Sequence, residues 1–211
     1  MARVFIATSN RGKLRDFAAA AAAFRIRVAP LANFSKLPPV EEDGATFEAN
    51  ARKKAEFYSR FAKGEIMLAD DSGLEVDALG GAPGVRSARY AAAEGQENSS
   101  DAANNQRLLR DLHFSADSAR GARFVCVIAA ARDGKTLRVF RGEAHGRILR
   151  ALRGSGGFGY DPLFYFPALD KTFAELTAKE KAKVSHRGAA LRAFLEWFRA
   201  RDKEPAKRRK R

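Results

Sequence analysis

Cysteine and long apolar runs are the two features that this sequence has least of. The 211 residues include one cysteine, Cys126, which excludes an intrachain disulfide and a metal site built from several cysteines. Its apolar neighbours predict a thiol packed in the core. Apolar runs such as residues 18–24 are too short to cross a membrane, and the first residues lack the apolar core of a signal peptide. We therefore expect a cytoplasmic protein.

Acidic residues are also scarce relative to basic ones, with 25 Asp and Glu against 39 Lys and Arg, a net charge of +14. Residues 201–211 hold seven of the basic residues and no large apolar side chain. We expect them to form a disordered basic tail behind a single domain of residues 1–200, with weak, salt-dependent nucleic-acid contact as the alternative role. The positive charge of the domain suits a polyanionic substrate as well as it suits DNA.

The remaining composition, 45% hydrophobic and 30% charged, is typical of one globular α/β domain. The sequence Asp133-Gly134 predicts a tight hairpin between two long strands, and hence a mixed sheet. Asp101 is the expected N-cap of its helix, and Asn50 and Lys54 are expected on the surface of theirs. Periodicity predicts strands at residues 3–7, 26–29, 65–69, 122–131 and 136–148, and helices at about 13–24, 46–61, 101–113 and 186–198.

Two adjacent carboxylates, Asp70 and Asp71, follow the buried strand expected at residues 65–69 and precede Ser72-Gly73. We expect them where the strand gives way to a turn, a common place for reactive groups on a rigid support. Mg²⁺ binds one or two such carboxylates and shares the oxygens of a substrate phosphate. The acidic residues 41–43 are further candidate ligands. A plain turn without a ligand is the alternative, since Asp, Ser and Gly all favour turns.

Three other segments carry candidate binding groups. Residues 8–13 join a strand to a helix N-terminus, where backbone N–H groups and Lys13 can hold phosphate, although Ser9 or Asn10 serving only as an N-cap explains the pattern too. The glycine-rich residues 154–162 present Phe158 and Tyr160, which can stack a nucleobase or belong to the core. His186 and Arg187 open the last helix, where cations are unfavourable, which indicates another purpose for them.

Taken together, eight short motifs resemble the inosine triphosphatase (Ham1-like) family, pyrophosphatases of non-standard purine nucleoside triphosphates. They occur in order between about residue 3 and about residue 198. They are Thr8-Ser9-Asn10-x-Gly12-Lys13, Glu41 with Gly44-x-Thr46-Phe47, Asn50-Ala51-x-x-Lys54-Ala55, Asp70-Asp71-Ser72-Gly73-Leu74, Gly80-Gly81-Ala82-Pro83-Gly84, Ser87-Ala88-Arg89-Tyr90, Gly156-Gly157-Phe158-Gly159-Tyr160-Asp161-Pro162 and Ser185-His186-Arg187-Gly188.

The resemblance implies hydrolysis of ITP, dITP and XTP to the monophosphate and pyrophosphate with Mg²⁺, in a homodimer. It also implies an elongated mixed sheet flanked by helices in two lobes. By the same resemblance Asp71 would accept a proton from water and bind Mg²⁺, with Glu41 as the second ligand. The residues that would hold phosphates and sugar are Thr8, Ser9, Asn10, Arg11, Gly12, Lys13, Lys54, Ser72 and Lys181. Those that would hold the base are Phe158, Gly159, Tyr160, Asp161, His186 and Arg187.

One position departs from the family pattern. Ala49 stands where the family usually has Glu, which removes a capping box with Thr46, and Glu48 in the first turn partly replaces it through the helix dipole. If the family's Glu helps to hold the metal, Glu41 and Asp71 must suffice here, with Glu42 or Asp70 as further candidates. Two rival functions stay open: a related pyrophosphatase for modified pyrimidine or methylated nucleotides, and a nucleic-acid-binding protein.

Overall fold

One seven-stranded sheet forms the centre of the molecule. The computed structural model describes residues 3–22, 24, 26–93 and 98–203. The strand order is β2-β1-β3-β4-β5-β6-β7, with β1 parallel to β2 and β3 and the other neighbours antiparallel, which confirms the expected α/β class with a mixed sheet. The strands are β1 (Arg3–Ile6), β2 (Arg27–Pro30), β3 (Met67–Val76), β4 (Gly121–Arg132), β5 (Lys135–Ile148), β6 (Phe164–Phe166) and β7 (Lys171–Thr172).

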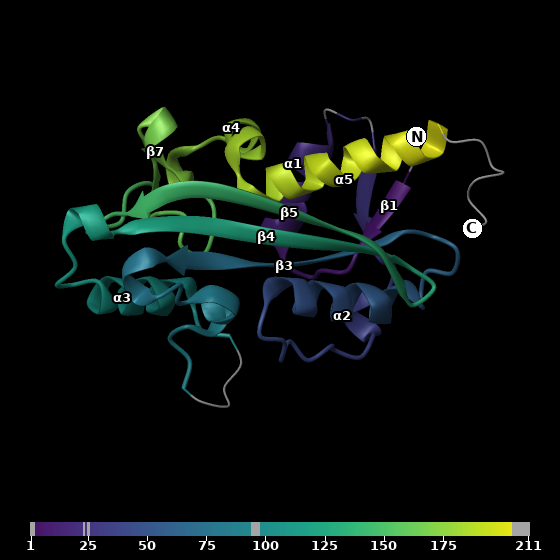
Figure 1. Cartoon of the computed structure of the whole chain (residues 1–211), viewed down its shortest axis with the longest axis horizontal. Coiled ribbons are helices and arrows are strands. Elements are labelled where there is room, and N and C mark those ends of the chain that lie inside the picture. Colours follow the sequence, from purple (N-terminus) through teal and green to yellow (C-terminus); the bar gives the residue numbers. More distant parts are fainter. Residues whose placement is uncertain (1–2, 23, 25, 94–97, 204–211) are drawn as a thin grey trace.

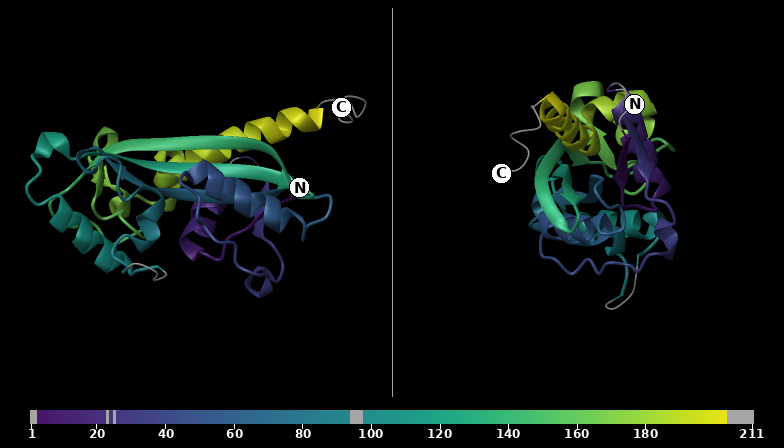
Figure 2. Two further views of the ribbon diagram at one scale, coloured as in Figure 1. Left: turned by 60° about the horizontal axis from the view of Figure 1, so that its bottom comes forward. Right: turned by 90° about the vertical axis from the view of Figure 1, so that its right-hand side faces the viewer.

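Helices cover both faces of the sheet (Figure 1). On one face lie α1 (Arg11–Ala22), α4 (Ala178–Val184) and α5 (His186–Lys203), and on the other lie α2 (Phe47–Ser59) and α3 (Asp101–Asp111) toward opposite ends of the long strands. The β4–β5 hairpin runs along the long axis and makes the molecule elongated (Figure 2). Short 3₁₀ helices are η1 (Phe34–Lys36), η2 (Asp77–Leu79), η3 (Gly84–Arg89), η4 (Asp117–Ala119), η5 (Pro167–Leu169) and η6 (Phe173–Glu175). In the described ranges no helix is long and apolar enough to cross a membrane.

The central strands are buried on both faces. Alternate residues such as Leu68 and Ile128 pack under α1 and α5, while Met67 and Val127 pack against α2. A third cluster joins α3 to the far end of the sheet. This double burial explains why the first residues of β3 and the middle of β4 are apolar without alternation. Cys126 is free and buried, as expected, and burial raises the pKa of its thiol.

Local signals in the sequence account for several boundaries. Asp133 and Gly134 both adopt positive φ, 50° and 82°, which is the twist that a two-residue hairpin requires, so the predicted hairpin is confirmed. At the start of α2 the side chain of Thr46 accepts a hydrogen bond from the backbone N–H of Ala49 at 3.1 Å. The substitution at Ala49 therefore keeps the N-cap and removes only the reciprocal bond of a capping box.

The predicted turn at Asp70 was wrong. β3 continues through residues 70–73 because β4 pairs with it along its whole length, for example Asp70 with Ile128. On its other edge β3 pairs with β1 only at Met67 and Leu68, since β1 ends at Ile6. The two carboxylates thus lie in the middle of a strand, just past the end of a neighbouring strand, where one edge of the sheet becomes accessible.

Three further expectations need correction. Asn50 and Lys54 are buried, with 1% and 8% exposure, because they turn toward the carboxylates of β3 rather than toward solvent. Ser100 caps α3, and Asp101 is its first helical residue. The last helix, α5, extends to Lys203, three residues into the predicted tail, and residues 204–211 of that tail lie outside the described residues.

Candidate active site

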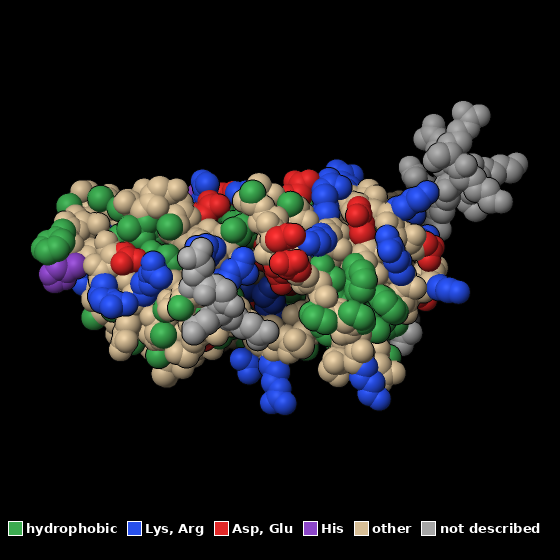
Figure 3. All heavy atoms as spheres, turned by 90° about the horizontal axis from the view of Figure 1, so that it is seen from below, with side chains coloured by type: hydrophobic (Ala, Val, Ile, Leu, Met, Phe, Trp, Pro, Cys, Tyr) green, Lys and Arg blue, Asp and Glu red, His purple; other side chains and the backbone are tan. Residues whose placement is uncertain are grey.

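A cavity of about 1250 Å³ lies between the α2 and α3 ends of the molecule. Figure 3 shows the molecule from the side of α2 and α3, where acidic and basic side chains meet around a hollow in the middle. Its walls come from the N-terminus of α1, the middle of β3, the acidic residues 41–43, η3 and residues 158–161. Segments from both ends of the chain therefore meet at the accessible edge of β3.

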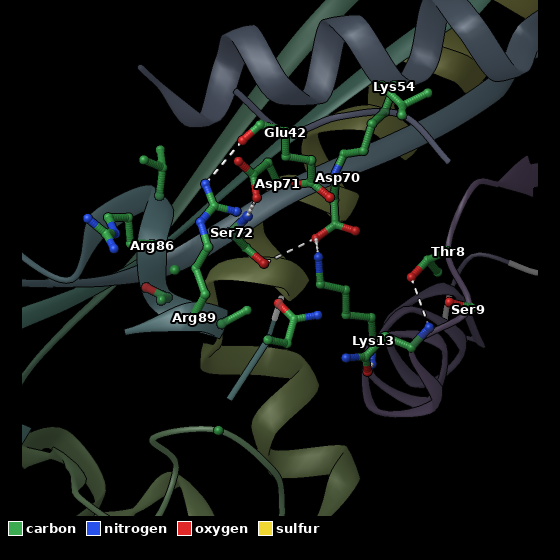
Figure 4. Close-up of a pocket in the computed structure, with 18 of the residues that line it drawn as sticks. Thr8, Ser9, Lys13, Glu42, Lys54, Asp70, Asp71, Ser72, Arg86 and Arg89 are labelled. Atoms are coloured by element: carbon green, nitrogen blue, oxygen red, sulfur yellow. Dashed lines mark hydrogen bonds and ion pairs between the residues drawn. The ribbon is translucent and has the colours of Figure 1, made fainter. Parts of the chain in front are cut away.

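Asp70 and Asp71 project from opposite faces of β3 and have different partners (Figure 4). Asp71 turns toward α2, where its Oδ2 accepts a hydrogen bond from Nδ2 of Asn50 at 2.9 Å. Asp70 turns toward α1, where its Oδ2 lies 2.9 Å from Nζ of Lys13 and accepts a bond from the Ser72 hydroxyl at 3.1 Å. The other oxygen of Asp70 is buried without a partner among the described residues.

The surroundings push the pKa values of the two carboxyls apart. Burial raises the pKa of Asp71 above its usual value and the charge of Glu42 adds to this, against the opposing effect of Lys54 and Lys13. Burial alone would raise the pKa of Asp70 too, but the charges of Lys13, Arg187 and Lys54 outweigh it and hold that pKa below its usual value. The two neighbouring carboxyls therefore differ in how readily they bind a proton, Asp71 more readily than Asp70.

Four cationic side chains surround these carboxylates, each held by a polar group. Besides Lys13, Nζ of Lys54 lies 2.8 Å from Oε2 of Glu42. Arg187 donates from Nη2 to the Ser72 hydroxyl at 2.9 Å, and Arg89 donates from Nη2 to the backbone carbonyl of Glu42 at 3.1 Å. Because the four cations come from α1, α2, η3 and α5, positive charges approach the two carboxylates from several directions.

The start of α1 supports Lys13. Asn10 accepts a hydrogen bond from the backbone N–H of Lys13 at 3.0 Å, and the Thr8 hydroxyl accepts one from Asn10 at 3.2 Å. Asn10 is thus the N-cap that the sequence predicted as one alternative. Both residues also line the cavity, so capping and ligand binding are compatible uses of this turn.

Phe158 is one of the aromatic residues that line the cavity. It is partly exposed, and the guanidinium of Arg187 and Nζ of Lys181 lie 4.9 and 5.0 Å from its ring centroid. Gly12 permits this placement, because a Cβ there would lie 2.6 Å from the ring. The ring of Tyr160 packs in the third core cluster, and its hydroxyl donates to the carbonyl of Ser87 at 2.8 Å. Of the two aromatic residues, Phe158 is the one placed to stack.

The structure brings most of the predicted site residues to one cavity. Those that line it are Thr8, Ser9, Asn10, Lys13, Glu41, Lys54, Asp71, Ser72, Phe158, Gly159, Tyr160, Asp161 and Arg187. Arg11, Gly12, Lys181 and His186 do not line it. Arg11 is exposed, and Lys181 is buried behind Phe158, where its Nζ lies 2.6 Å from Oδ2 of Asp161.

Sequence reasoning missed three residues that organise the site. Asn50 holds Asp71, Arg89 holds the acidic segment, and Asp16 lies 3.3 Å from Arg187 and 3.6 Å from Lys181. The position of Asn50 four residues before Lys54 was the available signal, because residues four apart share one helix face. Arg89 stands in the motif Ser87-Ala88-Arg89-Tyr90, which drew attention to it without giving it a role. For Asp16 the pattern offered no signal, since its partners lie far away in the chain.

His186 lies behind the cavity in an apolar setting. Its side chain is fully buried, and its ring stacks on Phe124 with centroids 4.7 Å apart and planes 11° apart. Neither ring nitrogen has a hydrogen-bond partner in the part of the chain that the structure describes. Burial lowers the pKa of this imidazole well below 6.5, helped by the charges of Arg187, Lys181 and Lys13, so the folded protein holds it neutral.

Acidification is therefore expected to destabilise the fold through His186. Below 6.5, its value in the unfolded chain, the unfolded state binds a proton that the folded state excludes. The free energy of unfolding is therefore not reduced by His186 above that pH, and it falls by about 1.4 kcal/mol per pH unit below it. Urea unfolding at about pH 7.5 and about pH 5.5 measures the loss, and His186→Phe should remove this part of it. An unchanged loss in that variant would contradict the assignment.

The charges that converge on Asp71 suit a substrate carrying several phosphates, and the exposed face of Phe158 suits one that also carries a base. Fold and site thus define a nucleotide-hydrolysing enzyme. The chain belongs to the Ham1 family, whose model matches residues 4–197. The resemblance drawn from the eight motifs is confirmed.

Relatives named as dITP/XTP pyrophosphatases match nearly the whole chain. A dITP/XTP pyrophosphatase from Acidobacterium capsulatum is 50% identical over 196 residues, covering 91% of this chain and 96% of its own. One from Geobacter sulfurreducens is 49% identical over 191 residues, covering 90% and 94%. The solved Ham1 protein of Staphylococcus aureus superposes with a TM-score of 0.79 at 41% identity, covering 94% of this chain and 99% of its own.

Proposed function

We propose that this protein hydrolyses dITP, XTP and ITP to the corresponding monophosphate and pyrophosphate, and so removes these nucleotides from the cytoplasmic pool. The observation that carries the proposal is Asp71, a carboxyl of raised pKa where Lys13 and Lys54 converge, in a cavity that also presents Phe158. The relatives described above are named for the same activity on dITP and XTP. Phosphoryl-transfer sites likewise place phosphate-binding cations around a carboxylate that accepts a proton.

Asp71 acts as the proton acceptor for the attacking water. Its Oδ1 accepts a bond from the backbone N–H of Ser72 at 2.9 Å and its Oδ2 accepts one from Asn50, which fixes the plane of the carboxylate. A carboxylate has about four acceptor positions, so two remain for water. Lys13, Lys54 and the Thr8–Asn10 turn hold the phosphates, so that the α-phosphoryl group faces that water.

The residues present fit Mg²⁺ as the metal. No group of three or more His, Cys, Asp or Glu side chains within the described ranges could hold a metal by itself. Mg²⁺ needs only one or two carboxylates when phosphate oxygens and water complete its shell. Asp71 and Glu41 would hold it, because Glu41 is exposed on the cavity wall and Glu42 is already paired with Lys54. The ion would neutralise phosphate charge. Ala49, which stands where the family usually has Glu, adds no carboxylate to this site.

Hydrogen-bond donors near Phe158 select among the purine nucleobases of the substrate. Hypoxanthine and xanthine present a carbonyl oxygen where adenine presents an amino group. Arg187 lines the cavity beside Phe158, so its guanidinium is the donor that we assign to that oxygen. Facing an amino group it would stay unpaired, a penalty of about 1–3 kcal/mol.

Product identity tests the proposal. Incubated with dITP and Mg²⁺, the protein should release dIMP and pyrophosphate in equal amounts, and it should act on XTP and ITP more efficiently than on dATP or dGTP. Release of free phosphate, or no turnover, would overturn the proposed reaction. A flat preference across purines with faster turnover of modified pyrimidine or methylated nucleotides would favour the rival pyrophosphatase instead.

A two-fold assembly is part of the proposal, carried by the family resemblance. Light scattering at micromolar concentration should report twice the chain mass of 23.1 kDa. A monomer across that concentration range would reject the assembly. Residues 201–211 are expected to add at most weak, salt-dependent contact with nucleic acid.

A further inference from the structure

We propose that Asp101 and Asn105 of α3 are positioning residues: they hold the peptide groups of Gly159 and thereby keep Phe158 in place for the purine. The proposal rests on the proposed function, since it concerns how that site binds its substrate. It is carried by a set of hydrogen bonds between α3 and residues 156–162, which we call the base loop. Neither residue emerged from the sequence motifs as part of the site.

Both backbone groups of Gly159 are bound by α3. The backbone N–H of Gly159 donates to Oδ2 of Asp101 at 2.7 Å, and its carbonyl accepts from Nδ2 of Asn105 at 2.9 Å. The same Nδ2 donates to the backbone carbonyl of Asp101 at 2.8 Å, which ties the side chain of Asn105 to the first turn of α3. Residues four apart lie on one face of a helix, so α3 presents an acceptor and a donor at the spacing of the N–H and C=O groups of one residue.

Gly159 needs this support. Its φ of 63° lies in the left-handed region, and nothing lies within 4 Å of the position that a Cβ would take there. A glycine without neighbouring atoms on that side is held by its backbone bonds alone, because it has no side chain to pack. Removing the bonds from α3 therefore lets the segment around Gly159 move.

α3 is itself fixed to the opposite wall of the cavity. Oδ1 of Asn104 accepts bonds from the backbone N–H of Ala91 and the hydroxyl of Ser99, both at 2.8 Å. These residues follow η3, which lines the cavity and accepts the Tyr160 hydroxyl bond at Ser87. One turn of α3 thus connects the base loop to the wall across from it, and neither contact involves a phosphate-binding cation.

The consequence for the reaction is a change in binding rather than in chemistry. Phe158 precedes Gly159 directly, and its ring faces the cavity beside Arg187. A mobile base loop weakens contact with the base to the same extent in the bound substrate and in the transition state. Such uniform loss of binding raises KM and leaves kcat nearly unchanged.

Asp101→Ala tests the proposal with matched variants. We expect KM for dITP to rise about tenfold, with kcat within about twofold of the parent. Asp101→Asn keeps an acceptor oxygen and should restore most of the affinity. Gln106→Ala, an exposed position on the same helix that makes no bond to the base loop, should behave as the parent. Equal KM for Asp101→Ala and Gln106→Ala, or an Asn variant as impaired as the Ala variant, would overturn the proposal.

Hydrogen exchange separates this inference from the proposed function, since it needs no turnover. Amides of residues 156–161 should exchange faster in Asp101→Ala, and also in Asn105→Ala, than in the parent and in Gln106→Ala. Unchanged exchange in both variants would overturn the positioning role even in an active enzyme. If the parent fails to hydrolyse dITP, the proposed function fails, while faster exchange still supports the hold of α3 on Gly159.

Discussion

Asp71→Asn should lower kcat for dITP by at least about 100-fold, which is what a general base is expected to contribute. The amide keeps the size of the carboxylate and can still accept the bond from the backbone N–H of Ser72. It cannot accept a proton from water, and it removes one of the two proposed metal ligands. Steady-state kinetics with dITP and Mg²⁺ measures the loss, and circular dichroism with thermal unfolding shows whether the fold is intact.

A control on the same strand distinguishes chemistry from damage to β3. Glu75 is paired with Arg123 at 2.7 Å and does not line the cavity. Glu75→Gln should therefore leave turnover close to that of the parent. Residual activity of Asp71→Asn within about tenfold of the parent would remove Asp71 from the role of general base.

The second large effect is expected from Lys13→Met, this time on stability as well as on activity. Lys13 lies 2.9 Å from Asp70, whose side chain is 1% exposed and whose Oδ1 has no partner among the described residues. Removing the lysine leaves a buried carboxylate short of its nearest cation, which typically costs about 3 kcal/mol of unfolding free energy. For a chain of this length we expect the melting temperature to fall by about 10 °C.

A double variant tests the cause of that loss. Lys13→Met combined with Asp70→Asn removes the uncompensated charge and should recover most of the lost stability in urea unfolding. Turnover should not recover, because Lys13 is also a proposed phosphate ligand. A loss below about 1 kcal/mol in the single variant would show that Arg187 and Lys54 suffice to stabilise Asp70.

Much of the fold could be predicted because its signals are local. The apolar face of α2, including Phe47, Ala51 and Ala55, follows helical spacing and is buried as predicted. The hairpin at Asp133-Gly134 depends on the backbone freedom of those two residues alone. The turn expected at Asp70 was wrong because the local preference of Asp, Ser and Gly was overridden by ten residues of pairing with β4.

The burial of polar residues in the site could not be predicted from local sequence signals. Asn50 and Lys54 occupy positions that look exposed on an isolated helix. They are buried because α2 packs over the stretch of β3 that carries Asp71, whose carboxylate accepts a hydrogen bond from Asn50. Asp101, which supports the base loop, looks like an N-cap in the sequence and instead binds the backbone of Gly159, a residue distant in the chain.

The sequence by itself determined which residue types the site contains and which segments carry them, because motif spacing and hydrophobic periodicity are properties of neighbours along the chain. Only the tertiary structure decided what surrounds each of the two adjacent carboxylates. Asp70 and Asp71 point to opposite faces of β3, where α1 and α5 bring cations to one and α2 brings an amide to the other. The pKa of each depends on that burial and on those charges, which assemble only when distant segments meet.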